Sequence, residues 1–304
     1  MKKSTINFDA IDMKNNKYKE VKLNPLLIKQ LKMDLNIKWT YNSTGIEGNS
    51  FTLNQTRVLL ADGITIGGKK IADHLEIIGH SKAIEYLEDI INNEIELTER
   101  EIKNLHSLVT KDIEGVNSGA YRNIDVYING SKHTPPSNVI VFEKMQQLML
   151  WYNNEGKNYH PIEKAAILHG KFVTIHPFID GNGRTARLLL NFELMKNNYP
   201  PIIIEVEERD KYFDALEAGN VSDDWDLFTE FIKQKCEERI DFMNEFKISE
   251  LKSRKWNNFK ERLQDKDEEI EEIVEDMKDD FTEHEIELLL LETGKDNDIK
   301  TKVR

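Results

Sequence analysis

The chain has 304 residues, of which 39% are hydrophobic and 32% are charged. This apolar share is enough for a sizeable core and excludes disorder over the whole chain. The formal net charge of -13 disfavours broad adhesion to nucleic acid or to anionic lipid, because both require a basic surface.

Residues 1–23 form a predicted N-terminal extension. The sequence begins with two lysines after Met1 and then reaches Asp9 and Asp12 without an apolar segment. A secretion signal or a membrane anchor would need such a segment, so we expect neither. Cys236 is the single cysteine, which allows no internal disulfide and favours a reducing, cytoplasmic location.

Apolar residues recur at helical spacing along most of the chain, which predicts an all-α body. A helix is expected to begin at Asn24 and Pro25, a cap residue followed by proline. Another long helix is expected from about residue 70 to 92. Capping pairs predict two further helix starts: Thr52 with Gln55, and Thr98 with Glu101.

Residues 119–137 depart from this helical pattern. The β-prone run DVYI at 125–128 is followed by Asn129 and Gly130, the dipeptide most typical of a tight hairpin turn. Pro135 and Pro136 cannot continue a strand ladder. The segment is therefore predicted to form a short β-hairpin.

Pro161 is expected to open a helix with a strongly apolar face that includes His169. A histidine on such a face is interpreted as a hydrogen-bonded core residue. His160, His169 and His176 do not have the spacing of a helical zinc pair, so a zinc site is disfavoured. Cys236, within a helical pattern, is interpreted as a small core side chain.

The chemistry is predicted to centre on residues 176–187, which read HPFIDGNGRTAR. Pro177 ends the preceding helix, so His176 is expected on a turn, where it is the natural general base. Asp180 supplies a hard oxygen ligand of the kind that Mg²⁺ prefers. The glycine-containing loop and the helix start after it predict a phosphate cradle, with these members: Gly181, Asn182, Gly183, Arg184 and Arg187.

Residues 246–304 mix many charged residues with isolated apolar ones. We interpret them as a charged helical appendage. A solvated helix whose apolar residues rest on the main body is the favoured form, and an arm that binds a partner is the alternative.

The segment HPFIDGNGRTAR matches the HPFx[DE]GNGRxxR signature of Fic proteins at every fixed position. The sequence resembles this family over about residues 24–234, within a Fic domain expected at residues 24–245. The resemblance implies a Fic-fold helical bundle with a β-hairpin flap at about residues 119–137. It further implies that His176 deprotonates the hydroxyl of a target, that Asp180 holds Mg²⁺, and that Arg184 and Arg187 contact the triphosphate of ATP. The intact GNG favours transfer of AMP over the kinase activity of Doc-type members.

Ser43 to Gly48 resembles the inhibitory [ST]xxxE[GN] motif that some Fic proteins carry in an N-terminal helix, here at about residues 26–48. The resemblance implies that Glu47 inhibits the enzyme, assisted by Ser43 and Gly48. Without the Fic motif, Glu47 and Gly48 would be interpreted as an ordinary helix end with a glycine cap. Within the flap, Tyr127, Ile128 and His133 are expected to contact the target.

The resulting hypothesis is a protein adenylyltransferase that uses ATP and Mg²⁺ to modify a Ser, Thr or Tyr hydroxyl of a target protein or of itself. One alternative is removal of AMP at the same site, alone or combined with its addition. A non-catalytic interaction module is an alternative of another class. A homo-oligomer is compatible with the sequence, whereas membrane and nucleic-acid partners are not expected.

Overall fold

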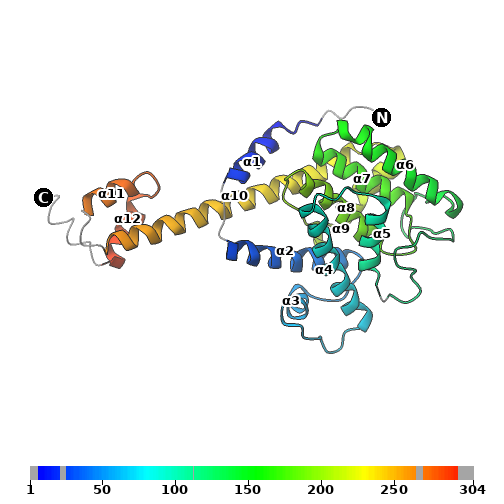
Figure 1. The fold of residues 1–304 in the computed structure, drawn as a ribbon, viewed down its shortest axis with the longest axis horizontal. Helices are drawn as coiled ribbons and strands as arrows, with labels where there is room; N and C mark the ends of the chain where they lie inside the picture. Colours follow the sequence, from blue (N-terminus) through cyan, green and yellow to red (C-terminus); the bar gives the residue numbers. More distant parts are fainter. Residues whose placement is uncertain (1–5, 21–24, 112, 265–269, 294–304) are drawn as a thin grey trace. The chain divides into compact units, whose positions relative to one another are not determined.

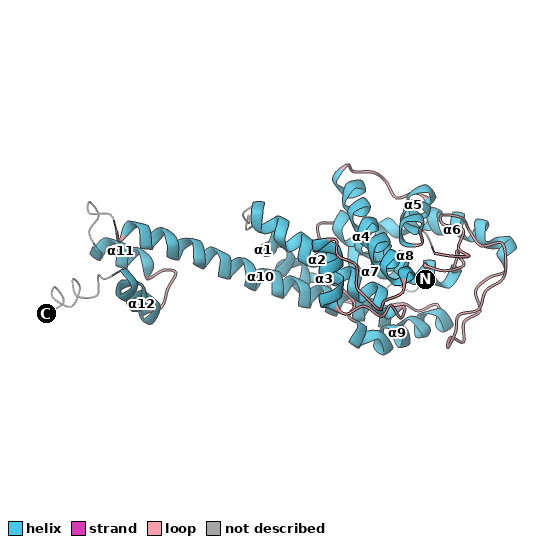
Figure 2. Cartoon of the chain, turned by 90° about the horizontal axis from the view of Figure 1, so that it is seen from below, coloured by secondary structure: helices cyan, strands magenta, loops and turns pink. Residues whose placement is uncertain are grey.

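The computed structural model describes residues 6–20, 25–111, 113–264 and 270–293. Within these ranges the regular structure is entirely helical (Figures 1 and 2), which confirms the predicted all-α class. The α-helices are α1 (Asp9–Glu20), α2 (Pro25–Ile46), α3 (Leu53–Asp62), α4 (Ile71–Asn92), α5 (Glu99–Val109), α6 (Val141–Asn153), α7 (Pro161–Ile175), α8 (Asn182–Lys196), α9 (Arg209–Ser222), α10 (Asp226–Arg262), α11 (Ile270–Met277) and α12 (Glu283–Thr293). Short 3-10 turns are η1 (Asn138–Ile140), η2 (Glu155–Asn158) and η3 (Val206–Glu208).

The described chain divides into two compact units. The first contains residues 6–16, 25–111 and 113–240, and the second contains residues 17–20, 241–264 and 270–293. No helix among these residues is both long enough and apolar enough to cross a membrane.

Local sequence signals explain several helix ends. The hydroxyl of Thr52 accepts a hydrogen bond from the N–H of Gln55, whose side chain accepts one from the Thr52 N–H in return, as the capping pair predicts. Thr98 caps α5 through the N–H of Glu101, but the Glu101 carboxylate instead accepts a hydrogen bond from Tyr86. The cap predicted at Asn24 lies outside the described residues.

The core of the first unit is built around α7 and α8. These helices pack against each other at the centre of the unit, and α4, α5, α6 and α9 surround them (Figure 1). His169 on α7 is fully buried and its Nε2 lies 2.9 Å from the Tyr212 hydroxyl, so it is a hydrogen-bonded core histidine. Cys236 is also fully buried among apolar side chains. This centre places the loop between α7 and α8 on a rigid support.

The β-hairpin predicted at residues 119–137 is absent, because this segment contains turns and extended chain but no paired strands. A tight turn does occur, with Gly130 at φ +81° and the N–H of Ser131 donating to the Ile128 carbonyl at 3.2 Å. The flanking segments are not paired because side chains take their backbone groups. Arg122 donates to the carbonyls of Ile124 and Pro136, at either end of the loop.

The second unit has a small apolar cluster of its own. Charged residues dominate its sequence, yet apolar side chains within it pack against one another. The cluster joins the end of α10 to α11 and α12, and it consists of Phe259, Leu263, Ile273, Met277, Phe281, Ile286, Leu289 and Leu290.

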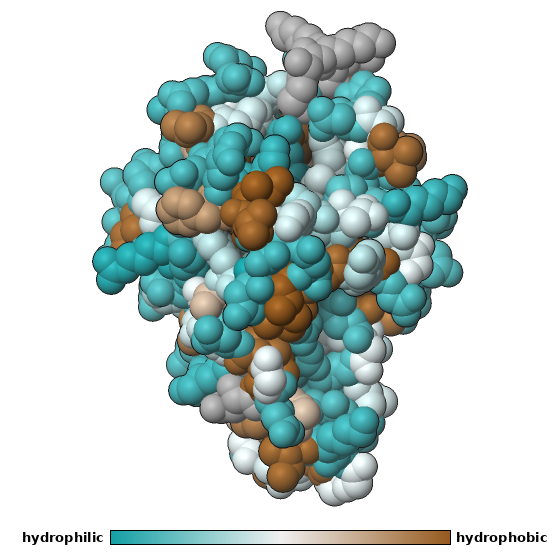
Figure 3. Space-filling model, turned by 90° about the vertical axis from the view of Figure 1, so that its right-hand side faces the viewer, coloured by the Kyte–Doolittle hydropathy of each residue, from teal (hydrophilic) through white to brown (hydrophobic). Residues whose placement is uncertain are grey.

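Hydrophobic residues on the face of the molecule in Figure 3 lie scattered among hydrophilic ones. Single exposed apolar side chains are normal on a protein surface.

Candidate active site

His176 lies on a sharp turn directly after α7. Its backbone is left-handed, with φ 50° and ψ 59°, and its N–H donates to the Phe172 carbonyl at 3.0 Å. Pro177 prevents the helix from continuing. The carbonyls of His176 and Pro177 accept hydrogen bonds from the side chain and the N–H of Arg122, at 2.8 and 2.9 Å. The turn itself is as expected from the sequence, and Arg122 adds a contact that holds it in place.

The loop from Asp180 to Gly183 leads into the N-terminus of α8. Gly181 is the left-handed residue, at φ 77°, and Asn182 is already helical. The Asn182 side chain closes the loop by bonding the N–H and the carbonyl of Phe178, at 3.0 and 2.9 Å. Thr185 is the first residue whose N–H bonds within the helix, to Gly181. The N–H groups of residues 182–184 therefore precede the helical ladder, and such groups favour anions.

The two arginines of the motif point to different partners. Arg184 is 1% exposed and forms ion pairs with Glu76 of α4 and with Asp180, the latter at 3.2 Å. Arg187 is 3% exposed and contacts the end of α2. Both arginines were expected in one phosphate cradle, but the two side chains diverge. Neighbouring positions on a helix face still allow long side chains to reach different partners.

Arg187 connects α8 to the segment that ends α2. Its Nε donates to the Ser43 hydroxyl at 3.0 Å, and its Nη2 donates to the Ser43 carbonyl and to a Glu47 carboxylate oxygen, both at 2.7 Å. Its Nη1 lies 3.4 Å from the Tyr212 hydroxyl. Gly48 follows at φ 100°, a conformation that favours glycine.

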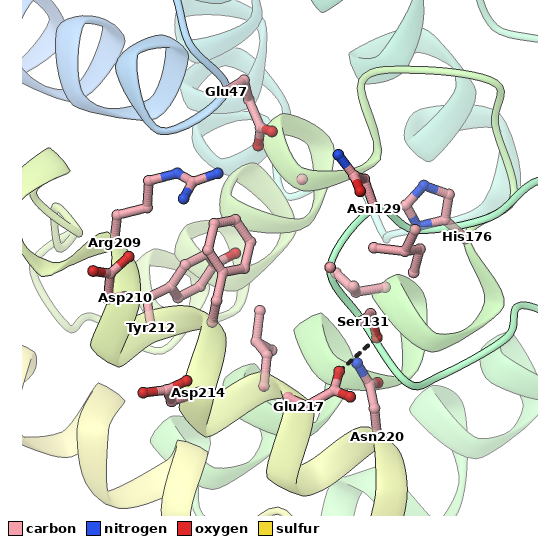
Figure 4. Close-up of a pocket in the computed structure, with 16 residues that line it drawn as sticks. Glu47, Asn129, Ser131, His176, Arg209, Asp210, Tyr212, Asp214, Glu217 and Asn220 are labelled. Carbon is pink, nitrogen blue, oxygen red and sulfur yellow. Dashed lines mark hydrogen bonds between the residues drawn. The ribbon is translucent and has the colours of Figure 1, made fainter.

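A pocket of about 640 Å³ opens beside this cluster, and its lining includes Glu47, Ile128, His176 and Gly183. In Figure 4 the Glu47 side chain extends into it from one side and His176 faces it from another, while residues of α9 and of the segment 128–131 form other parts of its wall. A Cβ atom at Gly183 would lie 2.2 Å from a Glu47 oxygen. The Glu47 carboxylate therefore lies directly against the backbone at the start of α8.

Burial lowers the pKa of His176 to about 4, although the Val173 carbonyl and Glu47 favour the charged form. The Arg122 guanidinium acts in the same direction as burial. The imidazole is therefore neutral at pH 7 and has a lone pair that can accept a proton.

The three expected target contacts in residues 119–137 have different positions. Tyr127 is 85% exposed, and Ile128 lines the pocket. His133 instead faces the body of the protein, where its Nε2 donates to the Thr174 carbonyl at 2.9 Å. The segment thus exposes Tyr127, places Ile128 at the pocket and is attached through His133.

Two residues that hold the site together were not identified from the sequence. Arg122 is buried and bonds main-chain carbonyls on both sides of the site. His106 accepts a hydrogen bond from the Gly119 N–H and donates to the Asp180 carbonyl, both at 2.9 Å, while its ring stacks on Phe178 at 3.5 Å. Both act on the backbone, so neither is marked by a chemical motif.

Known proteins resemble this chain in sequence. Residues 96–194 match the Fic/DOC family. The chain is 36% identical over 234 residues to a protein of Drosophila erecta named protein adenylyltransferase Fic, covering 77% of this chain and 47% of that one. A protein of the same name in Drosophila grimshawi is 38% identical over 215 residues, or 70% of this chain and 44% of that one. The chain thus spans about half the length of the curated relatives it matches.

Solved structures show the same relationship. Fic-1 from C. elegans superposes with a TM-score of 0.71 and 31% identity, over 77% of this chain and 69% of that one. A Fic domain containing signaling protein from Bacteroides thetaiotaomicron gives a TM-score of 0.72 with 28% identity, over 78% of this chain and 97% of that one. The sequence, the fold and the motif at the α7–α8 loop agree, and the chain belongs to the Fic/DOC family.

Proposed function

We propose that this chain is a protein adenylyltransferase, which transfers AMP from ATP to a Ser, Thr or Tyr hydroxyl of a target protein or of itself. The observation that carries the proposal is the pocket in which a neutral His176 and the start of α8 at Gly183 meet. Relatives that share 36–38% identity are named protein adenylyltransferase Fic. A proton acceptor beside an anion-binding helix start is what transfer of a phosphate-linked group to a hydroxyl requires.

His176 acts as the general base in this reaction. The target oxygen attacks the α-phosphorus of ATP, the bond from that phosphorus to the bridging oxygen breaks, and pyrophosphate leaves. His176 takes up the proton of the hydroxyl. A pKa of about 4 in the free protein keeps the base unprotonated, and a bound triphosphate raises that pKa because its negative charge stabilises the imidazolium.

The start of α8 binds the phosphates. The free N–H groups of Asn182, Gly183 and Arg184 and the positive end of the helix dipole favour anionic oxygens. Gly181 supplies the left-handed turn that directs these groups, and Arg187 supplies a guanidinium for the terminal phosphate. Arg184, paired with Glu76 and Asp180, contributes by fixing the loop.

Asp180 fits the requirements of a Mg²⁺ ion that is held mainly by the nucleotide. Its side chain is 52% exposed, and one oxygen accepts the Gly181 N–H at 2.6 Å while the other pairs with Arg184. Mg²⁺ commonly uses one or two carboxylates together with phosphates and waters. When bound, the metal would neutralise phosphate charge, and the Asp180 carboxylate would hold it beside the loop that precedes α8.

Glu47 holds the enzyme in a low-activity state. Its carboxylate occupies Arg187 at 2.7 Å and lies against Gly183, so it competes with the terminal phosphate for the guanidinium and for space. Ser43 supports the same pairing through two hydrogen bonds to Arg187. Gly48 provides the turn that brings Glu47 to this position.

Removal of AMP is the second candidate reaction. Glu47 lines the same pocket as His176, where a carboxylate could position a water for attack on a phosphodiester. Loss of AMP from a pre-modified protein, followed over time with wild type and with Glu47→Gln, separates this reaction from transfer.

Mass spectrometry of the purified protein after incubation with ATP and Mg²⁺ tests the proposed transfer. We expect an added AMP group on Glu47→Gly and none on Glu47→Gly combined with His176→Ala. A general base contributes about 10² to 10⁴-fold in rate, so the difference is measurable. Equal modification of both proteins would refute the assignment of His176.

A further inference from the structure

Glu217 joins the loop at residues 119–137, hereafter the flap, to helix α9. One carboxylate oxygen accepts a hydrogen bond from the Ser131 hydroxyl at 2.5 Å, and the other accepts one from the Lys132 N–H at 2.7 Å. Figure 4 shows Glu217 reaching Ser131 across the pocket wall. Both oxygens of one α9 side chain are therefore engaged by the tip of the flap.

The rest of the flap explains why this contact matters. Its two ends are fixed by Arg122, which bonds the carbonyls of Ile124 and Pro136 and is itself buried. Between these ends the described chain has no strand ladder to define its direction. The orientation of residues 126–134 is set by the contacts of Ser131 and Lys132 with Glu217 and by that of His133 with Thr174.

We propose that Glu217 is a positioning residue that holds the tip of the flap against α9, so that a target segment lies beside His176. The inference rests on the proposed function, in which the flap presents the target. Glu217 acts through Ser131 and Lys132 and does not itself take part in the chemistry.

A carboxylate suits this role because it accepts both hydrogen bonds at once. Bonds to a charged acceptor are stronger than neutral ones. Partial burial raises the pKa of Glu217, but the bonds from Ser131 and Lys132 outweigh it and the pKa lies below its usual value. Glutamine can keep both contacts as neutral bonds, whereas alanine loses both.

Graded variants test the inference in the full chain. We expect amide hydrogen exchange at Lys132 and His133 to accelerate about tenfold in Glu217→Ala, and less in Glu217→Gln, because a charge-assisted bond is lost or weakened. Glu207→Gln, on the exposed η3 turn, is the matched control that removes one carboxylate without touching the flap. Unchanged exchange at the flap in Glu217→Ala would overturn the inference.

Activity provides the second measurement, in a Glu47→Gly background. Self-modification with labelled ATP should fall about tenfold in Glu217→Ala and recover partly in Glu217→Gln, while the affinity for ATP is retained. A loss of ATP affinity equal to the loss of transfer would show that Glu217 serves the nucleotide and would overturn the inference. Global melting temperatures equal to that of the Glu207→Gln control would confirm that the change is local.

A double-mutant cycle that combines Glu217→Ala with Ser131→Ala tests whether the loss of transfer comes from the hydrogen bond between these two side chains. We expect Ser131→Ala to add little to Glu217→Ala, since both remove the same bond. Additive losses would contradict the role of that bond. The hydrogen-exchange result does not require activity, so it can fail or hold independently of the proposed transferase function.

Discussion

Replacing Glu47 with glycine removes the carboxylate that occupies Arg187. The guanidinium remains in place because its bonds to the hydroxyl and carbonyl of Ser43, at 3.0 and 2.7 Å, do not involve Glu47. The oxygen that lies closest to the Gly183 backbone also disappears. The variant therefore frees both the charge and the space that the phosphates need, and we expect higher transferase activity.

The magnitude follows from the contact that is lost. A hydrogen bond between charged groups contributes about 1.5 to 3 kcal/mol, which corresponds to a change of about ten- to a hundredfold. The Glu47 side chain is 32% exposed, and solvent screening places the pairing toward the lower part of this range. With Arg187 free to pair with the terminal phosphate, the α-phosphate also aligns with the attacking hydroxyl, and this alignment raises the activity further. We expect at least about a tenfold gain in AMP incorporation.

Incorporation of labelled AMP, with ATP affinity measured in parallel, is the assay. Glu47→Gln keeps the shape and one hydrogen bond to Arg187 without the charge, so its activity should lie between those of wild type and Glu47→Gly. Ser43→Ala should give a smaller gain in activity, because it removes one of the hydrogen bonds that hold Arg187 beside Glu47. If Glu47→Gly is no more active than wild type although it is folded and binds ATP, the inhibitory role of Glu47 is wrong.

Three further outcomes follow from the same geometry. His176→Ala in the Glu47→Gly background should lower transfer by about 10² to 10⁴-fold with ATP affinity retained, and calorimetric titration with ATP would detect any loss of binding. Gly183→Val in that background should weaken ATP binding by about tenfold or more, because a side chain at the start of α8 keeps phosphates from the N–H groups. Unchanged affinity for ATP would contradict the phosphate cradle. The free energy of unfolding should decrease as the pH falls from about 6.5 toward 4, because burial lowers the pKa of His106 and His176 to about 4 and the unfolded chain then binds more protons than the folded one. Each of these two groups accounts for on the order of 3 kcal/mol. Burial also lowers the pKa of His80 and His169 well below its usual value, so a flat profile in urea denaturation across this range would contradict the burial of these neutral histidines.

The helices and the turn at His176 were predictable from the sequence because their causes are local. The Thr52 cap, the proline that opens α7 and Pro177 each act on neighbouring backbone groups, and each helix end lies where these residues place it. The motif also identified the residues that meet at the α7–α8 loop. Such signals need no knowledge of distant contacts.

The conformation of the flap was not predictable in the same way. Its sequence has the residues of a hairpin, and the turn at Gly130 forms, but strand pairing depends on which backbone groups remain free. Arg122 and Glu217 take several of them from within the loop and from α9. The divergence of Arg184 from Arg187 is likewise set by Glu76 and Glu47, which lie far away in the sequence.

The contact that we propose to be inhibitory is made by a single side chain, Glu47, on a backbone with other contacts that hold it in place. Asn49, two residues after Glu47, donates to the carboxylate of Glu76 at 2.7 Å, and its N–H donates to a carbonyl of α2. The same Glu76 carboxylate holds Arg184 through its other oxygen. The turn after α2 and the start of α8 therefore share one anchor that does not include the Glu47–Arg187 pair. If Glu47 inhibits the enzyme as proposed, we expect relief to require only that its side chain leaves Arg187, while α2 and the phosphate loop keep their positions.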